Sequence, residues 1–204
     1  MKKRILAIFA VIVMTIVGGV YVISHNRTAQ GLTHEEESIF KHSFRLLEEQ
    51  TALYVKENFT GISKIEFSPI IFDGGSKSGD PLRVNVVPVV YDRHGNKAYL
   101  WRDAKGEPML RYGFHQGVEF DFGMNHKEVI FLDNSKTGGA IDVSNEQKLP
   151  DDAKMSEDEG IDMSLKVLTD AGQLVGVNKN KSGSPEAKVV YNLEIQKGDY
   201  SKWR

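Results

Sequence analysis

The chain has 204 residues, and its 26 Lys and Arg nearly balance its 28 Asp and Glu, which leaves a formal net charge of −2. It contains no cysteine, and this excludes a disulfide-built scaffold, a catalytic thiol and the lipid attachment of a bacterial lipoprotein. No basic stripe and no interleaving of aromatic with basic residues is visible along the chain, so we expect no nucleic acid partner.

The most apolar part of the chain is residues 5–23, a run of nineteen residues without a charge. As a helix this run would be about 28 Å long, close to the roughly 30 Å hydrocarbon core of a bilayer. Lys2, Lys3 and Arg4 precede it and only Arg27 follows closely, so the positive-inside rule places the N-terminus in the cytoplasm. We therefore predict a single-pass signal-anchor in the cell membrane.

A cleaved signal peptide and a buried helix of a soluble core are the alternatives. The run is longer than the apolar part of a usual signal peptide, and the best cleavage position, after Ser24, matches poorly because Val22 stands where a small residue is preferred. The predicted organisation is a cytoplasmic basic tail (1–4), the transmembrane signal-anchor (5–23), a tether (24–32) and one extracytoplasmic domain (33–204).

The outer domain is predicted to begin with an amphipathic helix over residues 33–58. Thr33 and Glu36 have the spacing of a capping box, in which the hydroxyl and the carboxylate each accept a hydrogen bond from an unpaired backbone N–H. The residues of one helix face then recur at steps of three and four: Phe40, Phe44, Leu47, Thr51 and Tyr54.

After this helix the pattern becomes that of strands. Ile65 and Phe67 alternate with charged residues, and Pro69 is predicted to place an edge or a bulge at the end of that strand. The Val-rich run 82–91 reads as one strand buried on both faces, and a glycine turn at 92–96 leads into a partner strand. Further strands of the same antiparallel sheet are predicted at 97–102, 109–112, 118–122 and 129–132.

A second helix is predicted to start at Ser156, where three acidic residues complement the helix dipole, and to end before Gly172. Two final strands are expected at 174–178 and 189–195. The sequence therefore predicts an α+β class, with the first helix packed on one curved antiparallel sheet and a second helix added.

The densest polar segment runs from residue 115 to residue 126 and contains the metal candidates His115, Glu119, Asp121 and His126. On a strand, Glu119 and Asp121 project from the same face about 7 Å apart. Carboxylates with imidazoles can bind a divalent metal or act in acid–base catalysis. The spacing matches no established ligand motif, however, and a strand with one solvent-facing side produces the same alternation.

No other segment carries a chemical motif. The loop 73–80 has acids, glycines and hydroxyls, but it lacks the ligand order of a calcium loop and the glycine spacing of a phosphate-binding loop. Ser184 lies between a glycine and a proline and not in a G-x-S-x-G turn. We therefore expect no catalytic residue and no cofactor.

From Tyr54 to Phe67 the chain reads YVKENFTGISKIEF, an aromatic helix end that passes through a Gly-Ile turn into a K-I-x-F strand. With the glycine-rich loop and the Val-rich strand that follow, residues 35–100 resemble small lipoproteins and membrane-anchored proteins of Gram-positive bacteria, many of them of unknown function. The resemblance implies a helix on a curved, cystatin-like antiparallel sheet and no catalytic residue. The chain departs from these proteins in lacking the lipid-attachment cysteine and in continuing into a second helix and closing strands.

We expect a non-enzymatic module at the bacterial cell surface, in contact with the lipid bilayer through residues 5–23, that binds a protein or an envelope component. One alternative is a membrane-tethered immunity protein that neutralises an extracellular toxin. The other is a metal-dependent enzyme that uses the segment from His115 to His126.

Overall fold

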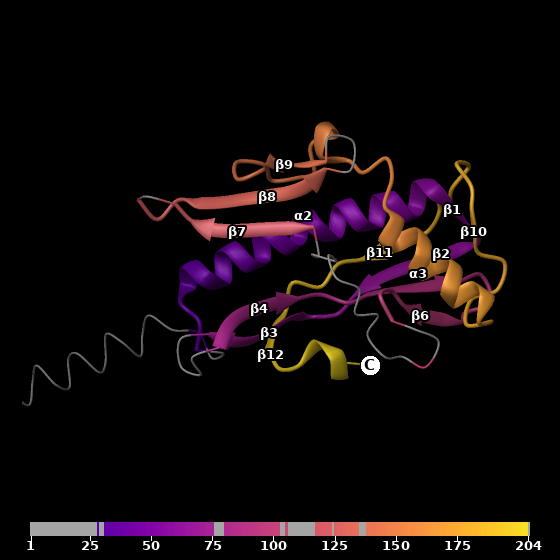
Figure 1. The fold of residues 1–204 in the computed structure, drawn as a ribbon, viewed down its shortest axis with the longest axis horizontal. Helices are drawn as coiled ribbons and strands as arrows, with labels where there is room; N and C mark the ends of the chain where they lie inside the picture. Colours follow the sequence, from indigo (N-terminus) through magenta and orange to yellow (C-terminus); the bar gives the residue numbers. More distant parts are fainter. Residues whose placement is uncertain are drawn as a thin grey trace, which may run out of the picture. The chain divides into compact units, whose positions relative to one another are not determined.

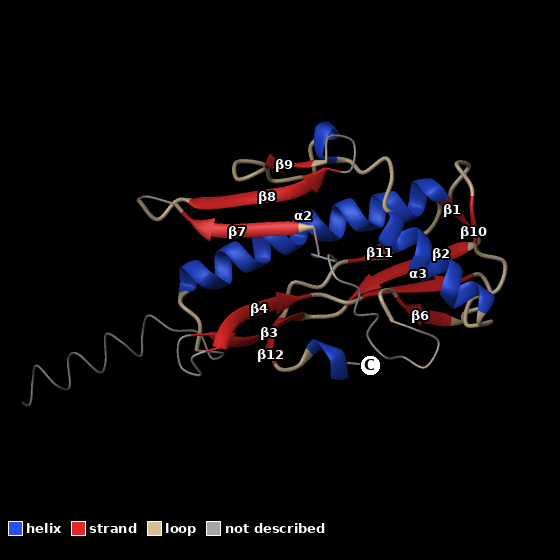
Figure 2. Ribbon diagram, in the orientation of Figure 1, coloured by secondary structure: helices blue, strands red, loops and turns tan. Residues whose placement is uncertain are grey.

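The computed structural model describes residues 28, 31–75, 80–102, 105, 117–123, 125–134 and 138–203. The chain divides into two units, Met1–Ser38 and Ile39–Arg204, and all of the described strands belong to the second. Within the described residues the fold is α+β, with two α-helices and several small sheets (Figure 1, Figure 2).

The long helix α2 (His34–Asn58) starts as the capping box predicts. Glu36 Oε2 accepts a hydrogen bond from the backbone N–H of Thr33 at 2.7 Å, and Thr33 Oγ1 accepts one from the N–H of Glu36 at 3.1 Å. The part of the helix in the second unit buries its apolar face, each side chain contributing about 1.5–3 kcal/mol. The prediction of this helix is confirmed, because all five residues of the predicted face are at most 3% exposed: Phe40, Phe44, Leu47, Thr51 and Tyr54.

A four-stranded sheet has the order β11-β2-β5-β6. β2 and β5 are antiparallel, as are β5 and β6, whereas β11 runs parallel to β2. Ile65, Val90 and Ala98 lie opposite one another on its inner side and are completely buried. The strands are β2 (Ile62–Phe67), β5 (Pro88–Asp92), β6 (Lys97–Tyr99) and β11 (Lys188–Val190).

Two three-stranded sheets lie on either side of α2 (Figure 1). Phe120 packs edge-on against Phe40 and Phe44 of the helix, with ring centroids 5.4 and 6.1 Å apart, and Phe40 also meets Phe72 at 6.3 Å. The helix is therefore held by aromatic contacts from both sheets. One sheet contains β12 (Ile195–Lys197), β3 (Ile70–Gly75) and β4 (Asp80–Asn85), and the other β7 (Val118–Phe122), β8 (Glu128–Asn134) and β9 (Gly139–Asp142).

The remaining elements are short apart from the second helix, α3 (Glu159–Asp170). Asp158 and not Ser156 caps this helix, because its carboxylate accepts a hydrogen bond from the N–H of Ile161 at 2.7 Å. Gly172 follows the helix with φ +73°, as predicted. The others are the pair β1 (Phe59–Thr60) and β10 (Asn178–Lys179) and the 3₁₀ turns η1 (Asp151–Ala153) and η2 (Tyr200–Lys202).

The Val-rich run 82–91 is not one strand, which corrects the prediction. The run divides between β4 and β5, and Val87 lies at the break. The N–H of Ser68 donates a hydrogen bond to the Val87 carbonyl at 3.0 Å, and the N–H of Val87 donates one to Ser68 Oγ at 2.8 Å. The break falls beside Pro69, which has no N–H to continue the ladder. The segment 189–195 divides in the same way between β11 and β12, and both of these pair in parallel.

The fold predicted from the sequence is therefore wrong, and only its α+β class agrees with the described residues. Several small sheets, two of them with a parallel pair, replace one curved antiparallel sheet. The predicted transmembrane helix at 5–23 and the predicted strand at 109–112 lie outside the described residues. Across the ranges that the structure does describe, no helix is both long enough and apolar enough to cross a membrane.

Candidate functional site

The metal candidates of the sequence are only partly visible in the structure. Glu119 and Asp121 project from the exposed side of β7, His126 lies exposed in the turn between β7 and β8, and His115 is outside the described residues. The Asp121 carboxylate accepts a hydrogen bond from the N–H of Phe122 at 2.7 Å. Within the described part of the chain no three His, Cys, Asp or Glu residues gather to hold a metal. A site that includes His115 stays a prediction.

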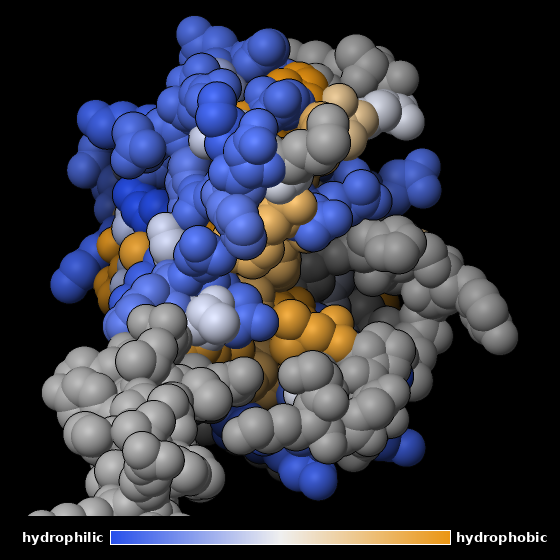
Figure 3. Space-filling view, turned by 90° about the vertical axis from the view of Figure 1, so that its left-hand side faces the viewer, coloured by the Kyte–Doolittle hydropathy of each residue, from blue (hydrophilic) through white to orange (hydrophobic). Residues whose placement is uncertain are grey.

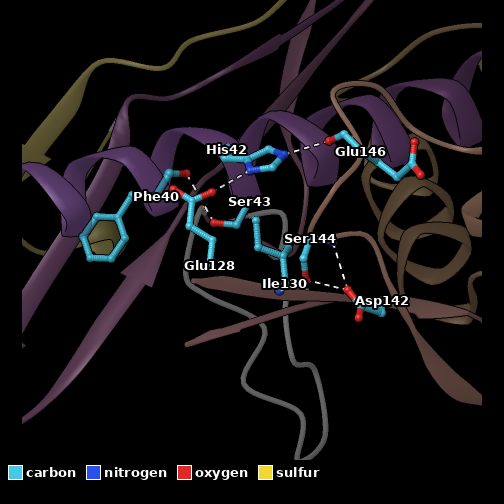
Figure 4. A network of polar contacts seen from close by, with 8 residues as sticks. All are labelled: Phe40, His42, Ser43, Glu128, Ile130, Asp142, Ser144 and Glu146. Atoms are coloured by element: carbon cyan, nitrogen blue, oxygen red, sulfur yellow. Dashed lines mark hydrogen bonds and ion pairs between the residues drawn. The ribbon is translucent and has the colours of Figure 1, made fainter. Parts of the chain in front are cut away.

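A different histidine is held in a polar network between α2 and the β7–β8–β9 sheet (Figure 4). His42 Nδ1 lies 2.8 Å from Glu128 Oε2, and His42 Nε2 lies 2.7 Å from the backbone oxygen of Glu146. Through these two contacts His42 joins α2 to β8 and to the segment that follows β9.

A groove of about 550 Å³ lies beside α3, and we call it the α3 groove. Apolar side chains from the helix and from the β1 and β10 region line it, and Met163 among them is 36% exposed. Charged side chains of both signs surround the apolar residues. The apolar lining is Phe59, Met163, Leu165 and Val177, and the charged lining is Glu159, Asp162, Lys166, Asp170 and Lys179.

The wall of the α3 groove is fixed by a buried tyrosine of α2. The Tyr54 hydroxyl donates to Asp162 Oδ1 at 2.8 Å and accepts from the backbone N–H of Asp158 at 3.0 Å. Burial, and next the bond to the Asp162 carboxylate, raise the pKa of Tyr54, so it stays a neutral donor. The other oxygen of Asp162 pairs with Lys179 of β10. These contacts hold the Asp162 side of the groove in place.

Another fixed point of the fold is Asp92, a fully buried carboxylate at the end of β5. Its oxygens accept hydrogen bonds from the N–H groups of His94, Asn96 and Val175 at 2.8–3.0 Å and from the Asn96 side chain at 2.8 Å. Burial alone would raise the pKa of Asp92, but these hydrogen bonds outweigh it and lower the pKa to about 2. Asp92 thus joins the β5–β6 turn to the segment that leads into β10.

A second buried carboxyl group, Glu48 of α2, does not line the α3 groove. Its Oε2 accepts from the N–H of Asn192 at 3.2 Å, whereas its Oε1 has no hydrogen-bond partner among the described residues. Burial raises the pKa of Glu48 to about 8, against the bond from Asn192 and the positive charge of Arg45. Glu48 fastens the segment between β11 and β12 to the helix.

The described lining of the α3 groove contains one hydroxyl, that of Thr169, and no histidine, serine or cysteine. Two ion pairs lie on the rim, Lys166 with Asp170 at 2.6 Å and Lys179 with Asp162. The carboxylate of Glu159 therefore gives the charged lining one negative charge in excess.

Hydrophobic residues also gather in a band between hydrophilic ones on the face that Figure 3 shows. Nothing in the described part of the chain indicates what would cover that band, so we assign it no role. Sequence reasoning missed the α3 groove because its lining comes from residues 59, 159–170 and 177–179, which no local pattern connects.

No known protein family, curated protein or solved structure matches the chain. The resemblance to small Gram-positive surface proteins therefore stays an expectation.

Proposed function

We propose that this protein is a non-enzymatic binding module and that the α3 groove is where it recognises a segment of a partner protein. The observation that supports this most directly is the combination of an apolar lining and a charged rim in one hollow of about 550 Å³. That volume lies within the roughly 300–1,000 Å³ of known ligand sites. An apolar centre with a polar rim is also the usual arrangement of a protein interface.

The exposed Met163 favours a protein segment as the occupant. Methionine has an unbranched, polarizable side chain that adapts to different apolar surfaces, and it is enriched at the centre of interfaces. The walls are pinned by Tyr54 and Asp162, so little ordering of this protein is needed when a partner binds.

The location of this module outside the cytoplasm is part of the same proposal and rests on the sequence of residues 1–27. It is tested by adding protease to intact cells that produce the full chain with a C-terminal tag. Loss of the tag from intact cells is expected, and protection of the tag until the cells are lysed would contradict an external location.

Photo-crosslinking in the producing cells tests the groove. The full chain carries p-benzoylphenylalanine in place of Met163, and in a matched control in place of Leu82 of β4, which is 41% exposed and does not line the groove. We expect a defined adduct from position 163 that is absent from position 82.

Specificity is then checked with a competing full chain. Unlabelled wild-type protein should suppress the adduct, and Met163→Glu should not, because a carboxylate at the apolar lining would have to be buried without a partner. An adduct with a second copy of this chain would identify the groove as a self-association site, and equal adducts from positions 163 and 82 would contradict the proposal. A captured toxin would identify the module as an immunity protein.

A further inference from the structure

One edge of the two-stranded β1–β10 sheet is free, and it lies at the α3 groove. Phe59 is paired with Lys179 and Thr60 with Asn178, and no other described strand pairs with β10. Phe59, Asn178 and Lys179 also line the groove. Because a free strand edge presents backbone groups that a further strand can pair with, the groove is bordered by a template for an extended chain.

The pairing pattern shows which backbone groups of β10 face outward. The N–H of Asn180 donates to the Asn58 carbonyl at 2.7 Å, so these two residues are a hydrogen-bonded pair. In an antiparallel ladder such pairs alternate with pairs that exchange no hydrogen bonds. Lys179, the next residue, therefore directs its N–H and its carbonyl away from Phe59. Neither group has a hydrogen-bond partner among the described residues.

The shape of the groove suits an extended segment. Lys179 lies on the same face of the sheet as Phe59, and its Nζ pairs with Asp162, so this face is turned toward α3. A strand added at the edge would direct every second side chain to this face, beside Met163. The lining of α3 runs from Glu159 to Asp170. At 1.5 Å per residue this wall is about 16 Å long, the length of about five extended residues.

The charge of the groove favours a basic segment. Both of its lysines already have carboxylate partners within the groove. Glu159, in contrast, is exposed, and its carboxylate has no ion pair among the described residues. A lysine or arginine of the bound segment would complement this excess negative charge.

We propose that the partner of the α3 groove binds as an extended strand of another protein. The strand pairs with the free edge of β10, places alternate apolar side chains in the groove and brings a lysine or arginine to Glu159. This mode of binding rests on the proposed function of the groove. A helix is the other common form of a bound segment, but its backbone groups are already paired internally, so it would leave the N–H and the carbonyl of Lys179 without partners.

Proline at position 179 tests the strand pairing, because it removes the outward N–H and no hydrogen bond of the β1–β10 pair. Lys179→Gln is the matched variant, which loses the same charge and keeps the N–H. Lys97→Pro is the control for proline at a free edge. The N–H of Asp92 donates to the Asn96 carbonyl, so Lys97, the next residue of β6, also directs its N–H outward, and it does not line the groove.

The readout is crosslinking in the producing cells. Each change is made in the full chain that carries p-benzoylphenylalanine at position 163, and the fraction of chain converted to the adduct is measured. We expect Lys179→Pro to lower this fraction about fivefold relative to Lys179→Gln, which corresponds to one lost backbone hydrogen bond. Lys97→Pro should leave the fraction unchanged. Circular dichroism and thermal unfolding of the purified chains check that each variant folds.

Charge variants test the same mode of binding without a change in the backbone. Glu159→Gln should lower the adduct fraction about threefold, and Lys179→Gln should raise it because the Asp162 carboxylate loses its partner. Glu186→Gln removes an exposed carboxylate outside the groove and should have no effect. Mass spectrometry of the adduct identifies the crosslinked segment, in which we expect a lysine or arginine and apolar residues at every second position.

Three results would overturn strand addition and leave the groove as a binding site. The first is an equal adduct fraction in Lys179→Pro and Lys179→Gln, and the second is an adduct fraction that Glu159→Gln does not lower. The third is a crosslinked segment with apolar residues at steps of three and four, which would indicate a bound helix. A crosslinked segment of this chain itself would overturn the assignment to another protein. Absence of any adduct from position 163 without further changes would contradict the proposed function, and this inference with it.

Discussion

Tyr54 of α2 and Asp162 of α3 are 108 residues apart in the chain, and their side chains meet at 2.8 Å. The same tyrosine oxygen accepts the N–H of Asp158 at the start of α3. This single hydroxyl therefore fixes both the position of α3 against α2 and the wall of the α3 groove.

Replacing Tyr54 by phenylalanine should destabilise the fold by about 1–3 kcal/mol, because the buried Asp158 N–H loses its partner and the Asp162 carboxylate loses a hydrogen bond. Urea unfolding of the full chain measures this. Tyr191→Phe is the matched control, since Tyr191 is 38% exposed and its ring contacts do not need the hydroxyl. Equal stability of the two variants would contradict the role given to Tyr54.

Asp92 should contribute to stability at neutral pH and lose that contribution in acid. Its folded pKa of about 2 lies below the unfolded value of about 3.9, so its stabilisation is complete above the unfolded pKa and is lost as the pH falls toward 2. Asp92→Asn should therefore lower the free energy of unfolding at pH 7 by about 1–3 kcal/mol. It should also reduce the change of that free energy between pH 4 and pH 2. Urea unfolding at a series of pH values measures both, with Asp121→Asn on exposed β7 as the control.

Glu48 should have the opposite pH dependence. Its folded pKa of about 8 lies above the unfolded value of 4.5, so the protein is most stable below the unfolded pKa and loses stability as the pH rises toward 8. Glu48→Gln, which is neutral at every pH, should remove this loss and stabilise the protein at pH 8 by up to about 4 kcal/mol. Melting temperatures at pH 5 and pH 8 test it, and an equal pH dependence in Glu48→Gln and wild type would contradict the assignment. Glu119→Gln, on the exposed side of β7, is the control.

Alanine substitutions at Gly61 and Gly95 distinguish the cost of backbone strain from the cost of steric overlap. Both have a left-handed φ, +84° and +86°, but a Cβ at Gly61 would lie 2.2 Å from the Gly176 carbonyl oxygen, whereas a Cβ at Gly95 would meet open space. Gly95→Ala should lower stability by about 1 kcal/mol through strain alone. Gly61→Ala should lower it by more than about 3 kcal/mol, since the backbone of the segment between α3 and β10 must move. If urea unfolding shows the same loss of stability in both variants, the expected steric overlap at position 61 is relieved without a cost in free energy.

The local elements of this protein were readable because short-range chemistry decides them. The capping box of Thr33 and Glu36 starts α2, the steps of three and four from Phe40 onward carry it to Asn58, and Gly172 ends α3. The alternation around Ile65 predicted β2 for the same reason. The start of α3 was misplaced because Ser156 and Asp158 are both good caps, and only the packing of Tyr54 against Asp158 distinguishes them.

What the tertiary structure alone decided is which distant segments become neighbours. The Val-rich run 82–91 could not be divided from its composition, because its break depends on Ser68 and Pro69 in another strand. The α3 groove is likewise built from segments more than a hundred residues apart, such as those of Phe59 and Met163. Hydropathy and capping patterns depend only on residues that are close in the sequence. A site is formed by strand pairing and helix packing between distant segments, and no local pattern predicts which segments meet.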